Sequence, residues 1–382
     1  MNVVRPAADL AAGPAPSVAL CPMPEPRSLR VIQFSTGNVG RHALRMLIER
    51  PGLALVGLHA HGPDKVGRDG AQLCGLPTPT GIPATDDLDA LVALGADCVV
   101  YTSQGETRPQ QAIEEICRFL RAGTNVVGTS MVWLVAPYQA DAWITGPLAA
   151  ACAEGGTSLY INGVDPGFSA DTLVYTALTL AGRARSVTVS EICDYASYDD
   201  AEFTGASFGF GTEPDHTPII FAPGVLSSLW GGQVRSLAEL LGVRLDEVRE
   251  SHESWVTPEP IDATMMSVAP GRVAAVRFAV QGLRGGEPVI TVEHVNRLTA
   301  AAAPDWAYPP DGRPGVHRVV VRGEPGVEIN THLGLDGVDH NEAGVISTAA
   351  RAVNAIGAVC AAAPGLLAAH DLPAAYARTV MV

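Results

Sequence analysis

The sequence is short of cationic side chains, and this shortage excludes one class of partner. Its 382 residues include 25 lysines and arginines against 40 aspartates and glutamates, which gives a formal net charge of −15 at pH 7. A chain with this charge repels a phosphate backbone. Nucleic acid is therefore not an expected partner.

Paired cysteines and long apolar runs are also missing. No two of the seven cysteines are spaced as C-x-x-C, so we predict neither a zinc knuckle nor a dithiol redox site, and no metal. Their odd number and wide spacing fit a reducing cytosol, and we predict a cytoplasmic location. No uninterrupted apolar run is long enough to span a bilayer, so no membrane partner is expected.

Residues 1–27 differ from the rest of the chain. The segment is rich in alanine and proline, has no steady period, and lacks a basic stretch followed by an apolar core. This composition argues against a signal peptide. We expect a disordered leader, and the alternative is a mis-assigned start codon.

Apolar strands alternate with helical segments from Leu29 to about Asn162. Runs such as LRVIQFS, LALVGLHA and DCVVYT are each followed by a stretch with helical spacing. This alternation predicts an α/β domain with a parallel, doubly wound sheet over residues 28–165.

The hydrophobic pattern changes after Gly163. Several later segments, among them ARSVTVSEICDY, GRVAAVRFAVQGL and PVITVEHVNRL, alternate with period two. They predict a mostly antiparallel sheet in a second, α+β domain over residues 166–340. A long helix of small apolar residues lies within residues 341–382, and we expect it to return and pack on the first domain.

The segment RVIQFSTGNVG, residues 30–40, reads as a strand, a glycine turn and the start of a helix. Gly37 and Gly40 occupy the second and third positions of the dinucleotide fingerprint G-x-G-x-x-G, and Ser35 stands in the first. The second glycine lets the backbone approach a pyrophosphate, and the helix N-terminus attracts the phosphates. A second strand follows at βαβ spacing, which supports the same interpretation. The predicted cofactor-binding residues of this turn are Ser35, Thr36, Gly37, Asn38, Val39 and Gly40.

The second strand ends near Ala60 without an acidic residue. An aspartate or glutamate at this point usually holds the ribose 2′-hydroxyl of NAD. Here His61, Lys65 and Arg68 follow the strand, and this pattern suits a 2′-phosphate. We predict NADP, with NADPH preferred and NAD as the alternative, although each of the three side chains could instead belong to a solvated basic loop.

Hydroxyl groups follow the next two strands. Thr102 and Ser103 come after DCVVY, and Thr129 comes after NVVG. Open α/β sheets bind ligands at the carboxyl ends of their strands, so we predict that these three residues contact the cofactor. Helix caps and turn hydroxyls are the alternative explanation for each.

Together with the glycine turn, the segments NGVDPGFSADTL, EHVNRL and ARAVNAIGAVCAAAPGL give the chain a family resemblance. It resembles the dihydrodipicolinate reductase-like proteins, in the actinobacterial branch related to native amine dehydrogenases and 2,4-diaminopentanoate dehydrogenase. The resemblance covers nearly everything from Leu29 onward. It implies a Rossmann domain, an antiparallel substrate domain, a nicotinamide cofactor, a homodimer, and reduction of a C=N bond in a small molecule or its reverse. It also implies that Asp165, within GVDPGF, lies beside the nicotinamide carboxamide.

Two departures from the family pattern bear on the chemistry. Where dihydrodipicolinate reductases carry His-His-x-x-x-Lys, this chain reads SEICDYASYDD without a lysine, so no role in lysine synthesis is expected. Where the amine dehydrogenases usually place a catalytic glutamate, this chain has Met131, which weighs against ammonia-dependent amination. A different proton donor is therefore needed. The candidates are His294, which the resemblance places at the substrate, Glu106 in the loop after the third strand, and Tyr195 with the neighbouring Glu191.

The leading hypothesis is an NAD(P)H-dependent oxidoreductase that reduces a small imine or carbonyl compound. Two alternatives stay open: a non-catalytic NADP-binding sensor or scaffold, and a plain carbonyl or hydroxy-acid dehydrogenase. Turnover of NADPH separates the enzyme from the sensor. Dependence of the rate on ammonia or an amine separates the first enzyme from the second.

Overall fold

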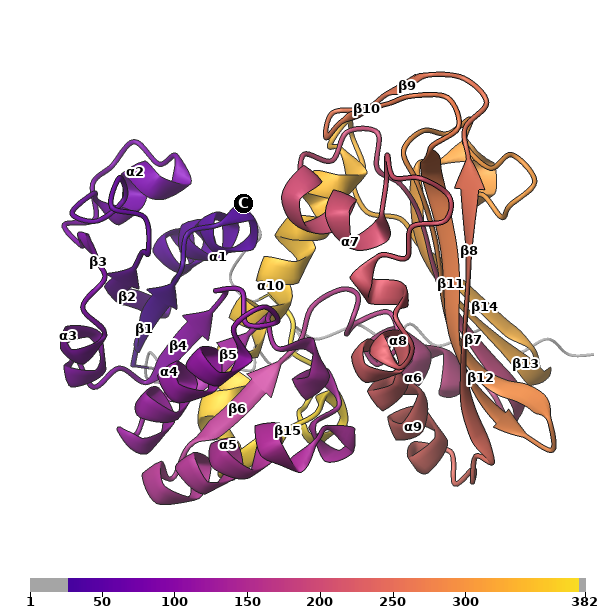
Figure 1. The fold of residues 1–382 in the computed structure, drawn as a ribbon. Helices are drawn as coiled ribbons and strands as arrows, with labels where there is room; N and C mark the ends of the chain where they lie inside the picture. The colour runs from indigo at the N-terminus through magenta and orange to yellow at the C-terminus, as the bar shows by residue number, and fades with distance from the viewer. Residues whose placement is uncertain (1–26, 378–382) are drawn as a thin grey trace, which may run out of the picture.

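The structure is a computed structural model, and it describes residues 27–377 (Figure 1). The expected leader, residues 1–27, lies outside the described residues except for Arg27. Two sheets dominate the described chain, and helices lie between them and on the outer side of the first sheet (Figure 1).

The first sheet has seven strands, and every neighbouring pair in it is parallel. Its order is β15-β6-β5-β4-β1-β2-β3, so the chain direction across the sheet reverses between β1 and β4. Ligands of open α/β sheets bind outside such a reversal, at the carboxyl ends of the strands. The strands are β1 (Leu29–Phe34), β2 (Leu53–His59), β3 (Ala84–Thr85), β4 (Cys98–Tyr101), β5 (Asn125–Gly128), β6 (Ser158–Ile161) and β15 (Gly365–Leu367).

Helices cover both faces of this sheet because its strands are apolar on both sides. On β1, Ile32 packs into a core with α3, α4 and α5, while the adjacent Val31 packs into a second core with α1 and α10. Successive side chains of a strand point to opposite faces, so one apolar run supplies both cores. The helices are α1 (Asn38–Glu49), α2 (Gly70–Cys74), α3 (Leu88–Ala93), α4 (Pro109–Arg121) and α5 (Ala142–Gly155).

The second sheet has six strands in the order β14-β13-β7-β12-β11-β8. All neighbours are antiparallel except β7 and β12, which run parallel. The prediction of a mostly antiparallel second sheet is therefore confirmed. The strands are β7 (Arg183–Asp194), β8 (Glu247–Val256), β11 (Val273–Arg284), β12 (Glu287–Arg297), β13 (Gly315–Glu324) and β14 (Val327–Thr331).

One face of the second sheet packs against helices and forms the largest apolar core of this half. Val189 of β7, Val292 of β12 and Phe278 of β11 meet Val234 and Leu237 of α9 there. The helices of this half are α6 (Thr172–Leu178), α7 (Ala206–Phe208), α8 (Val225–Leu229) and α9 (Gly231–Leu240), and two short strands, β9 (Ile261–Asp262) and β10 (Ser267–Val268), form a separate ribbon.

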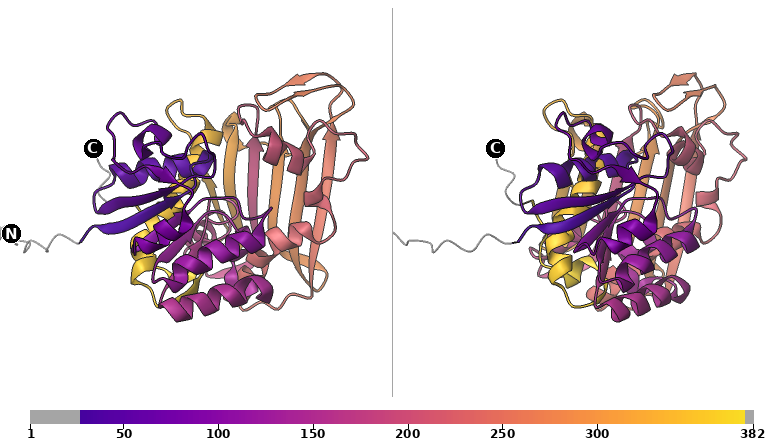
Figure 2. Two further views of the ribbon diagram at one scale, coloured as in Figure 1. Left: turned by 60° about the vertical axis from the view of Figure 1, so that its left-hand side comes forward. Right: turned by 90° about the vertical axis from the view of Figure 1, so that its left-hand side faces the viewer.

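The long helix α10 (His340–Ala361) returns to the first sheet, as predicted. Its small side chains Ala352, Val353 and Ile356 are buried against β1, β4 and β5, and Figure 2 shows the helix in yellow along that face. Among residues 27–377, it is the one helix long and apolar enough to cross a membrane by length and composition. Because its apolar residues pack on the sheet, we assign it to the core of the first domain.

Candidate active site

The glycine turn joins β1 to α1, and its two glycines have different surroundings. A Cβ atom on Gly37 would meet nothing within 4 Å, so this position is an open cradle at the helix N-terminus. A Cβ atom on Gly40 would lie 2.4 Å from the Ser35 carbonyl oxygen and 2.7 Å from Thr102 Oγ1. Gly40 is thus required for packing, whereas Gly37 leaves room for a ligand.

Ser35 holds the first position of the fingerprint with a φ of 80°. This left-handed conformation suits glycine and is uncommon for a serine. The backbone therefore makes the same turn that a glycine normally makes at this position, and the left-handed conformation of Ser35 is strained.

The three predicted hydroxyl residues, Thr102, Ser103 and Thr129, lie near this turn. Thr102 Oγ1 donates to the Phe34 carbonyl at 2.9 Å and accepts from Gln33 Nε2 at 2.9 Å. Ser103 Oγ lies 3.0 Å from His61 Nε2. Thr129 follows β5, the neighbour of β4. The structure thus brings the carboxyl ends of β1, β4 and β5 to one edge.

The loop after β2 presents no carboxylate at the end of the strand, where His59 and Ala60 stand. Lys65 reaches back to the glycine turn, and its Nζ donates to the Thr36 carbonyl at 3.3 Å. Arg68 is exposed. Burial and the nearby Arg108 lower the pKa of His61, so this ring is a neutral hydrogen-bonding group at neutral pH.

Arg108 is a cation at this edge that sequence analysis missed. Its guanidinium donates to Ser103 Oγ at 2.6 Å and pairs with Glu115 at 2.8 Å. Arg108 stands at the N-cap position of α4, next to its first-turn proline, and no local sequence pattern marks its contact with Ser103.

Glu106, in the loop after β4, contacts Met131 in the loop after β5. Met131 is fully buried and has a φ of 65°. The Glu106 carboxylate accepts hydrogen bonds from the backbone N–H groups of Met131 at 2.7 Å and Val132 at 3.2 Å. Glu106 therefore anchors this loop, and it does not line the cavity described next.

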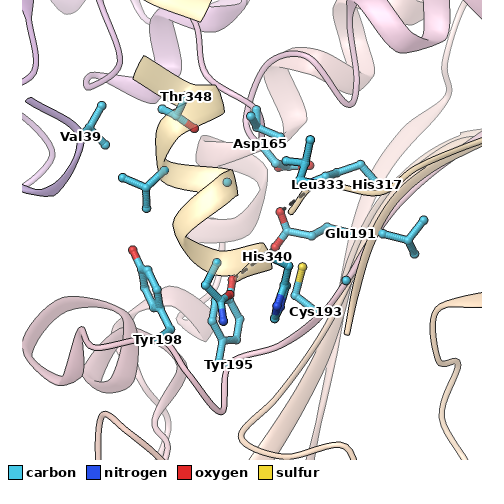
Figure 3. Close-up of a pocket in the computed structure, with 16 residues that line it drawn as sticks. Val39, Asp165, Glu191, Cys193, Tyr195, Tyr198, His317, Leu333, His340 and Thr348 are labelled. Atoms are coloured by element: carbon cyan, nitrogen blue, oxygen red, sulfur yellow. Dashed lines mark hydrogen bonds and ion pairs between the residues drawn. The ribbon is translucent and has the colours of Figure 1, made fainter. Parts of the chain in front are cut away.

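A cavity of about 200 Å³ lies between the start of α1, strand β7 and helix α10 (Figure 3). Val39 from the glycine turn lines it on one side, and Glu191 and Tyr195 from β7 and its end line it on the other. Asp165, from the segment GVDPGF, also lines it. Further lining residues that sequence analysis did not single out are Cys193, Tyr198, His317, His340 and Asn341.

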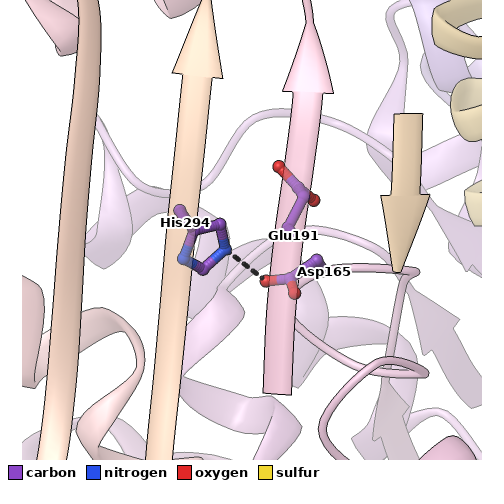
Figure 4. Close-up of side chains that lie close together, drawn as sticks. All are labelled: Asp165, Glu191 and His294. Carbon is purple, nitrogen blue, oxygen red and sulfur yellow. Dashed lines mark hydrogen bonds and ion pairs between the residues drawn. The ribbon is translucent and has the colours of Figure 1, made fainter. Parts of the chain in front are cut away.

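Asp165 and His294 form a buried ion pair behind this cavity (Figure 4). His294 Nε2 lies 3.0 Å from Asp165 Oδ1, and the two side chains are 3% and 2% exposed. Trp230 Nε1 donates to the same carboxylate oxygen at 2.9 Å. Burial alone would lower the pKa of His294, but the attraction of Asp165 outweighs it and the pKa is raised. Burial alone would raise the pKa of Asp165, and His294 and Trp230 together lower it.

Glu191 and Tyr195 line the cavity, and the buried Asn296 behind them completes a second polar group. Asn296 Nδ2 donates to the Tyr195 hydroxyl oxygen at 3.1 Å, and both residues lie 3.4 Å from Glu191 Oε1. Burial and the neighbouring Glu191 hold the pKa of Tyr195 well above its usual range. The phenol therefore stays protonated at neutral pH.

These features define a class of protein. A doubly wound parallel sheet with an open glycine turn, joined to a second sheet across a small polar cavity, is the arrangement of a two-domain oxidoreductase with a nicotinamide cofactor.

Comparison with known proteins gives the particular family. Residues 168–381 match the 2,4-diaminopentanoate dehydrogenase C-terminal domain. An amine dehydrogenase from Streptomyces virginiae is 38% identical over 349 residues, which cover 90% of this chain and 96% of the relative. The chain therefore belongs to the amine dehydrogenase family, and the family resemblance predicted from the sequence is confirmed.

Two solved structures share the fold. The amine dehydrogenase of Mycobacterium smegmatis superimposes with a TM-score of 0.74 at 20% identity, over 92% of this chain and 97% of that one. The biliverdin reductase of Synechocystis sp. PCC 6803, solved with biliverdin and NADP+, gives a TM-score of 0.50 at 12% identity, over 86% of this chain and 90% of that one. At these identities the two structures support the two-domain architecture alone.

Proposed function

We propose that the protein is an NADPH-dependent amine dehydrogenase for a small substrate. In the forward direction one carbonyl compound, one ammonium ion, one NADPH and one proton give one primary ammonium compound, NADP+ and water. The observation that supports the proposal is the cavity between the glycine turn and β7, because Asp165 and Tyr195 line it together with Val39 of the turn. Met131 stands where the sequence pattern of the family places a glutamate, so the proposal requires that other residues of this cavity replace it.

The residues present fit a dinucleotide. The open position at Gly37 and the helix start at Asn38 and Val39 would hold the pyrophosphate, with Ser35, Thr36 and Gly40 shaping the turn. Thr102, Ser103 and Thr129 would line the cofactor edge, and Asp165 would orient the nicotinamide carboxamide. The bound cofactor supplies the hydride.

NADPH rather than NADH is proposed from the loop after β2. The loop offers Lys65 and Arg68 for a 2′-phosphate, and no carboxylate ends the strand to hold a 2′-hydroxyl. His61 would contribute a hydrogen bond without a charge, since its pKa is lowered.

Among the predicted proton donors, Tyr195 and the neighbouring Glu191 line the cavity, whereas His294 and Glu106 do not. The Tyr195 hydroxyl lies at the cavity and is held by a hydrogen bond from Asn296, so we assign it the proton delivered to the product. His294 would act through Asp165, which it holds in place. Glu106 would act through the loop at Met131, whose backbone it binds.

The protein is further proposed to be a cytoplasmic homodimer. Helices α6, α8 and α9 cover one face of the second sheet, and within residues 27–377 no helix covers the other (Figures 1 and 2). A single-layer sheet is stabilised when its second face is covered, and a second copy would supply that cover. Light scattering at micromolar concentration should report a dimer, and a monomer would contradict this part of the proposal.

The proposed activity is tested by NADPH oxidation with a panel of small ketones and aldehydes, with and without ammonium. Turnover that depends on ammonium, together with NADP+ reduction by the matching primary amine, is the expected result. Equal turnover without ammonium would identify a carbonyl reductase instead. Tight NADPH binding without any turnover would favour a cofactor sensor.

A further inference from the structure

The cavity carries an excess of negative charge. Asp165 and Glu191 both line it, and none of its lining residues is a lysine or an arginine. One carboxylate oxygen of each and a ring nitrogen of His294 all lie within 4.8 Å of one another (Figure 4). His294 balances Asp165, so one buried carboxylate is left without a cation of its own.

Glu191 has only long contacts. Its side chain is 12% exposed, its hydrogen bonds with Tyr195 and Asn296 are both 3.4 Å, and its distance to His317 Nδ1 is 3.8 Å. That nitrogen of His317 has a shorter contact, 3.0 Å, with Ser169 Oγ. Contacts at these distances are weak, so the carboxylate retains accepting capacity toward the cavity.

Glu115 is a buried glutamate with a structural role, and its hydrogen bonds can be compared with those of Glu191. Its oxygens accept from Tyr101 at 2.6 Å, from Arg108 at 2.8 Å and from Gln111 at 2.9 Å. That carboxylate is fully paired within the protein. Leaving Glu191 poorly paired has a cost in folding free energy, and a ligand that pairs with it is one explanation for such a group in a native protein.

We infer that Glu191 is the residue that binds the cationic nitrogen of the substrate, either an ammonium ion or a primary ammonium group. Such a nitrogen carries three or four N–H donors and one positive charge, which match the accepting oxygens of Glu191 and the net charge of the cavity. Asp165 and the Tyr195 oxygen lie on the same cavity wall and complete the ring of acceptors. The inference rests on the proposed function and names the residue that selects an amine over an alcohol.

The isosteric variant Glu191→Gln tests this role, because it keeps the size of the side chain and removes its charge. We expect the KM for ammonium to rise at least tenfold and kcat/KM for the primary amine to fall about a hundredfold. The KM for the ketone and the affinity for NADPH should stay within twofold. Glu191→Asp, which keeps the charge, should recover part of the loss.

Glu293→Gln is the matched control. Glu293 lies on the adjacent strand next to His294, and its carboxylate accepts from Ser190 Oγ at 2.7 Å rather than lining the cavity. This variant removes one negative charge at a similar place in the fold. Its ammonium KM should equal that of the wild type, and an equal rise in both variants would overturn the inference in favour of a general loss of charge.

A binding measurement separates this inference from the proposed activity. Calorimetry of the NADPH complex with isopropylammonium chloride should show binding to the wild type and not to Glu191→Gln, while isopropanol should bind neither detectably. Such binding without turnover would support the Glu191 site and refute the proposed reaction. Ammonium-dependent turnover with an unchanged ammonium KM in Glu191→Gln would refute the Glu191 site and leave the reaction in place. Loss of activity with EDTA, restored by a divalent metal, would assign the two carboxylates to a metal and overturn the inference.

Discussion

Substitutions at the two glycines of the β1–α1 turn should have opposite effects on stability and on cofactor binding. Gly37→Val adds a side chain where a Cβ meets nothing within 4 Å, and its φ of −74° is open to any residue. The variant should fold normally. Its branched side chain would occupy the pyrophosphate position, and we expect dinucleotide affinity to fall at least about a hundredfold, or about 2.7 kcal/mol.

Gly40→Ala should instead destabilise the fold. Its Cβ would lie 2.4 Å from the Ser35 carbonyl oxygen, about 1 Å inside the usual separation of about 3.5 Å. Since this obstacle is backbone, it cannot rotate away. Overpacking of this kind costs about 1–3 kcal/mol, and we expect the upper end of that range. A loss of about 3 kcal/mol should lower the melting temperature by about 5–10 °C.

Calorimetric melting and NADPH titration of the two variants measure these effects separately. Gly146→Ala is the control, because Gly146 is exposed within α5 and a Cβ there also meets nothing within 4 Å. It should match the wild type in NADPH affinity and be equally or slightly more stable. A folded Gly37→Val variant with unchanged NADPH affinity would refute the assignment of this turn, and a Gly40→Ala variant with wild-type stability would refute the packing argument.

Three further predictions follow from the loop after β2 and from the buried groups of the cavity. NADPH should bind about tenfold to a hundredfold more tightly than NADH at low salt, because two charge-assisted contacts each contribute about 1.5–3 kcal/mol before screening. Replacing both Lys65 and Arg68 with alanine should remove this preference in competitive titrations, and equal binding of both cofactors to the wild type would contradict it. Tyr195→Phe should lower kcat about a hundredfold or more with NADPH affinity unchanged, and full turnover would move proton delivery to another group. The Asp165–His294 pair should stabilise the fold most between about pH 3.8 and 6.5, the ordinary values of the two groups. Above that window its contribution is lost as pH rises through the raised pKa of His294, and below it the contribution is lost as pH falls through the lowered pKa of Asp165. The difference in unfolding free energy between the wild type and His294→Gln should follow this profile, and a difference independent of pH would exclude the ion pair.

The architecture was predictable because its signals are local. Alternating apolar strands and helical segments predict the first sheet, and Gly37 and Gly40 predict the turn that joins β1 to α1. The edge strand β8, by contrast, was missed. Its sequence EVRESHESWV is mostly charged and polar and has no alternation of apolar residues that would mark a strand. Pairing with β11 and contacts of its side chains with the core and with α8 hold it in the sheet.

The glycine turn, the two-domain fold and the family resemblance were determined by the sequence, since each depends on residues close together in the chain. The cavity was decided by tertiary structure. His294 meets Asp165 from 129 residues away, and Asn296 meets Glu191 from 105 residues away. Sequence spacing gave Tyr195 and Glu191 as candidates without distinguishing them from Glu106, whose carboxylate turned out to bind the backbone at Met131. Whether a buried carboxylate has hydrogen-bond partners within the protein or is free to bind a ligand depends on how distant strands pack. A local sequence pattern therefore cannot predict it.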